Sequence, residues 1–539
     1  MDSQQATLAI CGATVVVAYI WYTRCRTHSI SDVPGPKNPS WIYGHRWSWM
    51  IEEAAVVEKK LLEGHGSIVR WNRSFGEEHL WVADPKAVHH ILQGSNRLYE
   101  KPQFVRERAA ILMDRGLLAV EGDAHKRQRR AMTPAFGLVE AKALYPYFVR
   151  CSNSLADKWH DIISNAGSGE AAVIDVYSWL SKATLDAIGT GAFDYDFGAL
   201  ENTDNRLTKS FNAFGPPSKG RGLIMDLLKW APKGLGAWLT DRSKSPGMIK
   251  LRENKTYAHE VASKLIKEKK QEMKDGTSGK DFLSLLVKAN SALRPDLRLN
   301  DDEIVPQIRT IMFAGHETTA KTLIFALWEF ANKRHVQERL RTEIMETLGR
   351  IRARGESDFT VSDFDSMPYL VAVGKEILRV YPVVVEMQRA PIEDDVLPLS
   401  KPIVGLSGKV YNDLHVPAGT IVAVSTVGYN LNKDVWGPDA YEFRPERWLD
   451  MNEKVESPVG VYGNLATFSG GYRSCIGWRF AVIELHTFLV TLVRQFDFSL
   501  ADGGQEVKIM RPAMMTPMVV GEEHKGPQMP LKVTFLGIE

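Results

Sequence analysis

One long stretch, residues 300–333, does most to limit what this chain can fold into. It reads NDDEIVPQIRTIMFAGHETTAKTLIFALWEFANK, and Asn300 and Glu303 have the spacing of a helix capping box, with Pro306 near the tolerated first turn. As one helix it would be roughly 50 Å long, at 1.5 Å per residue. Because it is apolar over most of its circumference, we expect it to run through a large core, interrupted only by the polar AGHETT.

The chain before residue 100 predicts a β-hairpin followed by a helix. SIVRW (67–71) and HLWVA (79–83) are rich in apolar and β-forming residues and are separated by NRSFGEE. Asp84 then stands where a helix cap is expected, with Pro85 in the first turn.

The rest of the pattern favours a mainly α fold with small β-sheets. From about 100 to 350 it is mostly helical, with a polar break at 272–281 that predicts a loop. After residue 380 short strands and proline-rich coil follow, and a closing helix begins near 478. No internal repeat is present.

Composition excludes some classes of protein. The 539 residues are 44% hydrophobic and carry a formal net charge of only +2, whereas nucleic-acid binders more often show a strong basic excess. Nucleic acid is therefore not an expected partner. The four cysteines, Cys11, Cys25, Cys151 and Cys475, show no disulfide framework, which is typical of a reducing compartment.

The N-terminus predicts a membrane anchor. Residues 6–22 carry no charge, and Arg24 and Arg26 follow them. A cleaved signal peptide is the alternative, but it would carry positive charge before the apolar run. We expect residues 1–28 to form one transmembrane helix, with the positive flank and the main body in the cytosol.

A stiff linker is expected after the anchor. SDVPGPKNPS contains Pro34, Pro36 and Pro39 around a glycine, and proline restricts both its own backbone and that of the preceding residue. Residues 29–40 are thus interpreted as a proline-rich linker, and 41–539 as a single catalytic domain.

A glycine-rich loop, FSGGYRSCIGWRFA (468–481), surrounds Cys475. Its glycines permit a loop that leaves the sulfur facing a metal, and a thiolate ligates haem iron in a way that favours cleavage of the O–O bond. Arg473 supplies a cation for a haem propionate, and Phe468 shields the sulfur. A lone cysteine is more often a small buried hydrophobe, so the surrounding pattern carries this interpretation.

That pattern resembles the haem-binding loop of the cytochrome P450 superfamily of haem-thiolate monooxygenases. The matching positions are Phe468, Gly471, Arg473, Cys475 and Gly477. The resemblance spans nearly the whole chain and implies the P450 fold, haem b as cofactor and Cys475 as the axial ligand of the iron.

Two further motifs support the resemblance. Glu376 and Arg379 in KEILR resemble the family's E-x-x-R pair, and Arg447 in FRPERW resembles the third member of the same charge network. Glu376 and Arg379 are one helical turn apart, and a buried arginine can satisfy a carboxylate and backbone carbonyls together. The alternative is a weak, exposed ion pair.

Glu317 and Thr318 in AGHETT match the family's acid–alcohol pair, which relays protons to dioxygen. The relay needs a carboxylate that reaches solvent, and Ala314 and Gly315 are small enough to leave room for dioxygen. The alternative is that Thr318 bonds back to its own helix and Glu317 is solvated. His316 has no assigned role and is not expected to bind iron.

Residues 122–136 predict a helix that contacts the haem propionates. The family usually has W-x-x-x-R here, and this chain has His125 in place of tryptophan while keeping Arg129. Arg389 resembles a further propionate contact. The remaining cations are expected to attract an acidic electron donor; they are Lys126, Arg127 and Arg130.

The resemblance places a largely apolar substrate pocket near several segments, in which Glu386 remains unassigned. Residues 222–239 are apolar and are interpreted either as a membrane-dipping segment or as core helices. The segments are 101–120, 205–245, Phe313 and Ala314, Val383 to Met387, and Met514 to Pro517.

The implied function is hydroxylation of a hydrophobic small molecule by O2, in the endoplasmic reticulum membrane. NADPH would supply electrons through cytochrome P450 reductase, with cytochrome b5 as an optional second donor, because the chain has no nucleotide or flavin site of its own. By analogy, a terpenoid substrate in fungal secondary metabolism is the first hypothesis. The alternatives are a reductase-independent enzyme acting on hydroperoxides and a haem carrier or sensor.

Overall fold

The computed structural model of the chain describes residues 30–537 apart from 96, 168–169, 202–222, 224–225, 228, 230–233, 278, 280, 451–457, 502–504 and 512–513. The predicted anchor at 1–28, with Cys11 and Cys25, lies outside the described residues. Within them, no helix combines the length and the apolar character needed to cross a bilayer.

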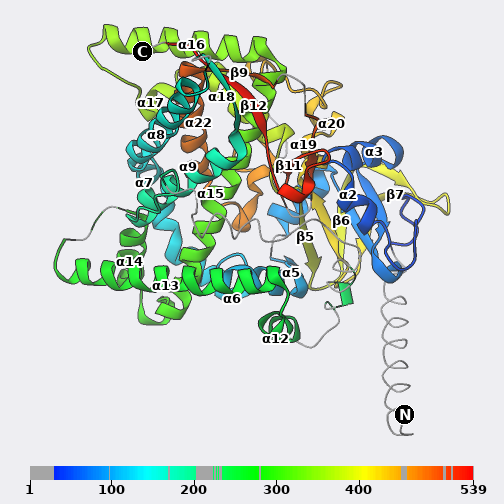
Figure 1. The fold of residues 1–539 in the computed structure, drawn as a ribbon. Helices are drawn as coiled ribbons and strands as arrows, with labels where there is room; N and C mark the ends of the chain where they lie inside the picture. The colour runs from blue at the N-terminus through cyan, green and yellow to red at the C-terminus, as the bar shows by residue number, and fades with distance from the viewer. Residues whose placement is uncertain are drawn as a thin grey trace.

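The predicted central helix is α15 (Asp301–Asn332), which passes through the middle of the molecule (Figure 1). Asn300 accepts from the Glu303 backbone N–H at 3.0 Å, and Glu303 accepts from the Asn300 N–H at 3.2 Å, so the capping box is confirmed. Pro306 lies in the second turn rather than the first, where it removes one helical hydrogen bond. Most of α15 is buried, as its apolar circumference predicts.

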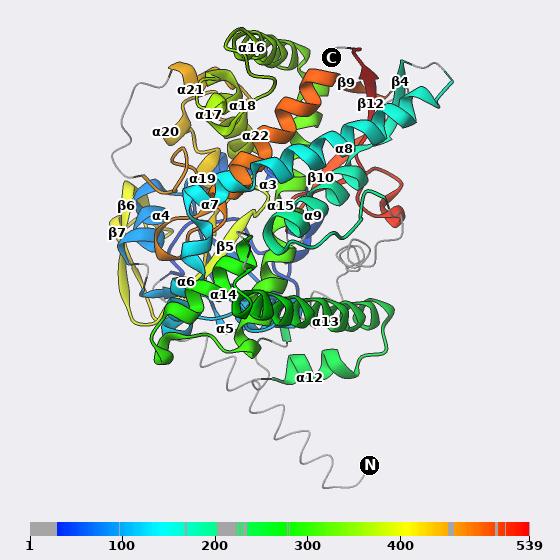
Figure 2. The ribbon, with the colours of Figure 1, turned by 90° about the vertical axis from the view of Figure 1, so that its left-hand side faces the viewer.

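Long helices surround α15. It packs against α9 (Val176–Phe193) and α22 (Trp478–Gln495), and α22 also runs beside α8 (Tyr145–Ser164) (Figure 2). The other long helices are α13 (Pro246–Lys274), α16 (Arg334–Ala353) and α18 (Pro368–Val380). The shorter ones are α2 (Arg46–Ile51), α3 (Val56–His65), α4 (Pro85–His89), α5 (Gln103–Met113), α6 (Gly122–Met132), α7 (Leu138–Ala143), α12 (Leu235–Arg242), α14 (Phe282–Ala292), α17 (Val361–Phe364), α19 (Thr426–Asn430), α20 (Lys433–Trp436) and α21 (Arg447–Asp450).

The strands form small sheets, as predicted. The largest has the order β1-β2-β8-β5-β3, a second has β4-β12-β9, and β6-β7 and β10-β11 are hairpins. The strands are β1 (Ile68–Asn72), β2 (Glu78–Val82), β3 (Tyr99–Glu100), β4 (Ala171–Asp175), β5 (Glu386–Pro391), β6 (Asp395–Val404), β7 (Val410–Val416), β8 (Val422–Ser425), β9 (Phe496–Leu500), β10 (Val507–Met510), β11 (Thr516–Val519) and β12 (Pro530–Phe535).

Local signals account for the ends of several elements. β1 and β2 pair as an antiparallel hairpin in which Ile68 faces Val82. Asp84 caps α4 by accepting from the Ala87 N–H at 3.1 Å. The polar break after α13 ends at Asp281, which caps α14 by accepting from the Ser284 N–H at 2.9 Å. The predicted hairpin and the Asp84 cap are confirmed, whereas the polar break predicted at 272–281 starts only after Lys274, where α13 ends, and its residues 278 and 280 lie outside the described residues.

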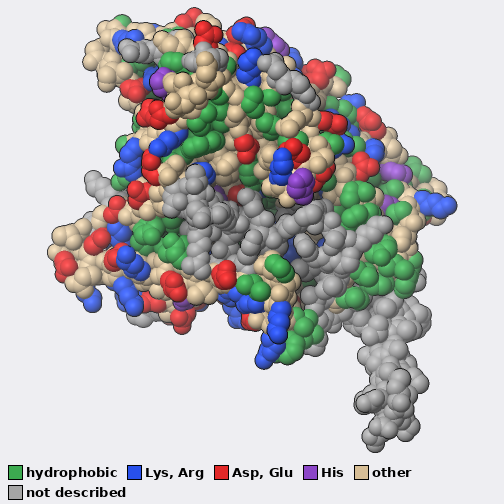
Figure 3. Space-filling view, viewed as in Figure 1, with side chains coloured by type: hydrophobic (Ala, Val, Ile, Leu, Met, Phe, Trp, Pro, Cys, Tyr) green, Lys and Arg blue, Asp and Glu red, His purple; other side chains and the backbone are tan. Residues whose placement is uncertain are grey.

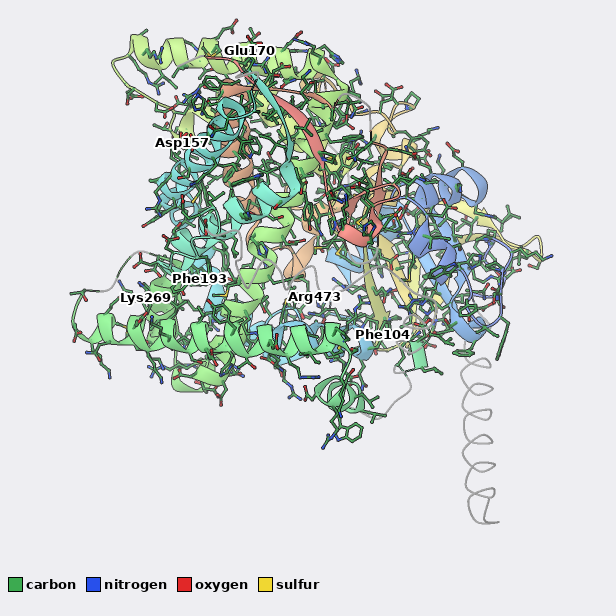
Figure 4. All side chains as sticks on the ribbon, viewed as in Figure 1. Phe104, Asp157, Glu170, Phe193, Lys269 and Arg473 are labelled. Carbon is green, nitrogen blue, oxygen red and sulfur yellow. The ribbon has the colours of Figure 1, made fainter. Side chains whose placement is uncertain are left out.

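The five-stranded sheet and most long helices occupy different sides of the molecule, and the cysteine loop lies between them. In the view of Figure 1 the long helices lie to the left and the five-stranded sheet to the right. Arg473, two residues before Cys475, lies between the two parts (Figure 4). Acidic and basic side chains are interspersed over the face in Figure 3, in keeping with the small net charge.

Candidate active site

The loop before α22 holds Cys475 through backbone bonds. The Cys475 N–H donates to the Phe468 carbonyl at 2.8 Å. Gly471 has a φ of 63°, which favours glycine, and a Cβ at Gly470 would lie 2.1 Å from the Val459 carbonyl oxygen. Gly477 differs, because its φ of −93° suits any residue.

The Cys475 side chain is exposed, but protein lies around its thiol. Burial raises the pKa of the thiol. A hydrogen bond from the Gly477 backbone and the charge of Arg129 act in the opposite direction and favour the thiolate. Phe468, only 9% exposed, packs in the same loop.

Arg129 holds the cysteine loop directly. From α6, its Nη1 donates to the Ser474 carbonyl at 2.5 Å and its Nη2 to the Ser474 hydroxyl at 3.2 Å. Arg129 therefore binds Ser474, the residue before Cys475. Its contact with a haem propionate stays a prediction.

A second group of cations lies beside the same loop. Arg473 donates to Glu121 from Nε at 2.8 Å and from Nη2 at 2.5 Å. The Lys101 ammonium lies 3.5 Å from Glu121, and burial lowers the lysine pKa to about 8. Arg389 is buried, and among the described residues it donates only to the adjacent Gln388 carbonyl; burial together with Arg473 lowers its pKa to about 10. Two cations thus pair with the Glu121 carboxylate, and Arg389 adds a third cation nearby.

His125 packs against this group as a neutral side chain. It is 2% exposed, and its ring meets Tyr472 edge to face at 4.8 Å. Burial, followed by the charge of Lys101, lowers its pKa to about 3. Its Nδ1 is buried without a hydrogen-bond partner among the described residues.

Glu376, Arg379 and Arg447 form one buried network. Arg379 grips the Glu376 carboxylate with Nε at 2.9 Å and Nη2 at 2.8 Å, and Arg447 Nε donates to it at 3.0 Å. Burial raises the pKa of Glu376, but the bond and charge of Arg379 outweigh this effect and lower it.

The arginines of this network also bind the chain that leads to the cysteine loop. Arg379 donates to the carbonyls of Asn430, Ala440 and Glu442 at 2.6–2.9 Å. The structure therefore brings the three predicted residues together, and the alternative of an exposed pair does not apply because all three are buried.

Glu317 is held inside the protein rather than solvated. Its carboxylate lies 2.9 Å from Lys321 Nζ and accepts from the Tyr177 hydroxyl at 3.3 Å. Burial is the largest influence and raises its pKa, but the charge and hydrogen bond of Lys321, together with His316 and Tyr177, outweigh burial and lower the pKa. His316 Nε2 is 3.5 Å from the same carboxylate. The expectation that Glu317 reaches solvent is wrong, because Lys321 and Tyr177 enclose it.

Thr318 lies on a different face of α15 from Glu317. It is half-buried, like Phe313 and Ala314, and its hydroxyl donates to the Ala314 carbonyl at 2.7 Å. The carboxylate of Glu317 and this hydroxyl are not bonded to each other. The predicted acid–alcohol relay therefore stays a prediction, and this geometry matches the back-bonding alternative for Thr318.

Gly315 serves packing rather than dioxygen. A Cβ there would lie 2.8 Å from the side chain of Ile188, on α9. The lack of a side chain lets α9 approach α15 closely, so the expectation that Gly315 leaves room for a ligand is corrected.

A family model, Cytochrome P450, matches residues 34–521. The chain belongs to the cytochrome P450 family. Cytochrome P450 monooxygenase 205 of Postia placenta is 33% identical over 542 residues, which cover 98% of this chain and 97% of that protein. Cytochrome P450 monooxygenase claQ of Ampulloclitocybe clavipes is 31% identical over 513 residues, which cover 93% and 92%.

P450 membership implies haem, and the residues present fit it. Haem brings two carboxylates, and the corner beside Cys475 offers an excess of buried cations together with the unpartnered Nδ1 of His125. A buried cation is costly until an anion pairs with it. The residues that would hold the group are Cys475 at the iron and Lys101, His125, Arg389 and Arg473 at the propionates.

Sequence reasoning missed three residues of this P450. Glu121 and Lys101 complete the cation group, but no local pattern joins them to Arg473, which is 352 residues beyond Glu121. Lys321 is four residues after Glu317 on a helix, which is the spacing of an ion pair and was a usable signal. Arg127, which was assigned to steering a partner, is paired with Glu303, and its steering role stays a prediction.

Proposed function

We propose that this P450 monooxygenase hydroxylates a hydrophobic small molecule with O2 and electrons from NADPH delivered by a separate reductase. The observation that carries the proposal is Cys475, whose exposed thiol lies at the end of a loop held by a backbone bond to Phe468 and by Arg129. When bound there, haem supplies the activation of O2 and its insertion into a C–H bond.

The protein's own residues position the cysteine loop and hold the protons that the reaction needs. Arg129 and the Phe468 carbonyl fix the loop that carries Cys475. The Thr318 hydroxyl donates a hydrogen bond to the Ala314 carbonyl. A rotation about χ1 would turn the hydroxyl, with its proton, away from that carbonyl. Glu317, kept ionised by Lys321, is a proton acceptor behind the helix.

An acidic electron donor is expected to dock over α6. Lys126 and Arg130 are exposed there, on the helix whose Arg129 touches the cysteine loop. Two exposed cations attract an acidic partner at long range. Cytochrome P450 reductase is the proposed partner, with cytochrome b5 as an optional second donor.

Turnover with and without NADPH tests the proposal. The full chain, reconstituted with a fungal reductase, is expected to oxidise a lipophilic substrate only when NADPH, reductase and O2 are all present. Product formed from a hydroperoxide without NADPH would favour the rearranging enzyme instead. An iron with no open position and no product under either condition would favour a haem carrier.

The substrate class is proposed from the pocket. Phe313, Ala314 and Val384 are apolar and not fully buried, which suits a hydrophobic ligand. A terpenoid of fungal secondary metabolism remains the first hypothesis. A panel of terpenoids, steroids, fatty acids and aromatics, read by the shift of the haem spin state, ranks these classes.

We propose the endoplasmic reticulum membrane as the location, with residues 1–28 as anchor. In the described part of 222–239, Leu227, Trp238 and Leu239 are exposed, which favours contact with a membrane over a core position. Deleting residues 1–28 should leave part of the protein on membranes. Complete release into the soluble fraction would contradict the contribution of the second segment.

A further inference from the structure

Lys321 joins the acid of the predicted relay to a strand outside the central helix. It is 4% exposed, and its Nζ lies 2.9 Å from the Glu317 carboxylate, one turn back on α15. The same ammonium donates to the Thr516 hydroxyl at 3.0 Å, at the start of β11. Because a lysine has a flexible four-carbon stem, this second bond fixes where the ammonium lies. Thr516 therefore helps to hold Glu317 in place.

The Glu317 carboxylate is held by groups that belong to three elements. The Tyr177 hydroxyl donates to it from α9 at 3.3 Å, and His316 Nε2, on α15, lies at 3.5 Å. The third element is β11, which acts through Lys321. All four of these side chains are buried. The carboxylate is thus kept away from Thr318, which lies on another face of the helix.

The start of β11 also touches the other segment that was predicted to line the substrate pocket. The Met515 N–H donates to the Val383 carbonyl at 2.8 Å. Thr516 uses its one hydroxyl proton to donate to the Met514 carbonyl at 3.0 Å, so the same oxygen is left to accept from Lys321. The two predicted lining segments therefore meet one residue away from the partner of Lys321.

We propose that Lys321 is a positioning residue that couples ligand contact at the start of β11 to the placement of Glu317. A ligand that displaces Thr516 moves a group bonded to the Lys321 ammonium, and the ammonium then moves relative to the carboxylate. Binding in the pocket thereby sets how firmly Glu317 is held away from Thr318. This rests on the proposed monooxygenase function and adds control of its proton relay by the bound substrate.

The first test measures equilibrium binding and needs no turnover. Clotrimazole, a bulky imidazole, and imidazole itself both bind an open haem iron through nitrogen. Their dissociation constants are measured from the Soret shift of the haem-loaded full chain. Because coupling between two sites is reciprocal, a change at Glu317 must alter the binding of a ligand that fills the pocket. Glu317→Gln should weaken clotrimazole binding about fivefold and leave imidazole binding unchanged.

A double-mutant cycle isolates the part played by Lys321. In the Lys321→Met protein, Glu317→Gln should no longer change the affinity for clotrimazole. Thr516→Val should weaken clotrimazole binding, whereas Thr516→Ser, which keeps the acceptor, should not. Thr487→Val is the matched control, because Thr487 is also buried and its hydroxyl donates to the Ile483 carbonyl of its own helix at 2.7 Å. This variant should bind both ligands as the wild type does.

Three results would overturn the coupling. They are clotrimazole binding that Glu317→Gln leaves unchanged, a Glu317→Gln effect that persists in the Lys321→Met protein, and failure of clotrimazole to bind where imidazole does. The carbon monoxide spectrum of the same samples reports whether the haem-thiolate centre has formed.

Turnover gives a second readout, which a merely structural ion pair would not move. Thr516→Val should lower the product formed per NADPH and raise the solvent isotope effect on product formation, because delivery of protons becomes slower. Thr516→Ser should restore both quantities. A wild-type protein that makes no product with NADPH would contradict the proposed function, while the binding cycle would still decide the coupling.

Discussion

Two buried arginine clusters in this P450 differ in whether the protein satisfies them. Around Glu376, the carboxylate accepts from Arg379, Arg447 and the Trp448 indole, and the arginines bind backbone carbonyls as well. Around Glu121, one carboxylate pairs with Arg473 and Lys101, while the Gln388 carbonyl is the only acceptor for Arg389 in the part of the chain that the structure describes.

The difference separates a structural network from a binding site. A closed network stabilises the fold because each buried charge has its partners, and removing one leaves the others uncompensated. An open group with excess positive charge destabilises the empty protein and gains its partners when an anion binds.

The largest effect is expected in the closed network. Arg379→Ala should lower the free energy of unfolding by about 3–5 kcal/mol, because it strands the buried carboxylate of Glu376. Chemical unfolding and haem content measure it. Arg334→Ala breaks an exposed pair with Glu338 and should change the free energy of unfolding far less. Equal losses of unfolding free energy in Arg379→Ala and Arg334→Ala would contradict the structural role of the Glu376 network.

Lys321→Met tests the smaller closed pair with Glu317. Because Lys321 lowers the pKa of Glu317 below its ordinary value of 4.5, the pair stabilises the fold above that pH and loses this contribution as pH falls through the lowered pKa. Without Lys321, burial raises the pKa, so stability should fall by about 2 kcal/mol at pH 7 and partly recover toward acid pH.

The pH dependence of unfolding measures this effect, and Lys264→Met, in an exposed pair with Glu268, is the control. A Lys321→Met profile that runs parallel to the wild-type profile would show that Lys321 does not hold the Glu317 charge.

Arg389→Gln should give the opposite result from Arg379→Ala. The haem-free protein should be no less stable, because the substitution removes a buried cation that lacks a carboxylate. Haem should leave about tenfold faster, as measured by transfer to a haem-free acceptor protein. Arg130→Gln, on the exposed side of α6, should change neither quantity. Destabilisation of the haem-free Arg389→Gln protein would show that the cluster around Glu121, like the one around Glu376, is a structural network rather than a binding site.

Thr318→Val should have the smallest effect on stability, below about 1 kcal/mol, because it removes a bond within one helix. Product formed per NADPH should nevertheless fall, with peroxide released instead. Thr322→Val removes the same kind of bond one turn later and should leave this ratio unchanged. An unchanged ratio in Thr318→Val would remove Thr318 from the proton relay.

The sequence predicted features that depend on neighbours along the chain. The capping box of α15 and the one-turn spacing of Glu376 and Arg379 are local, and the structure has both. The partner of Arg473 is Glu121, and that of Arg127 is Glu303, 176 residues beyond it. These pairs form because the packing of the fold brings distant parts of the chain together. Helical periodicity, which is a local pattern, therefore does not predict them. Gly315 was misread because Ile188, its neighbour in space, is on another helix.

The central claim is that Cys475 ligates haem iron as a thiolate. The most direct test is the carbon monoxide difference spectrum of the reduced, purified protein beside its Cys475→Ser variant. The wild-type protein should show the strongly red-shifted Soret band of a thiolate-ligated iron with an open position, and the variant should lose it. A wild-type spectrum typical of nitrogen ligation, or the same red-shifted band in Cys475→Ser, would contradict the account.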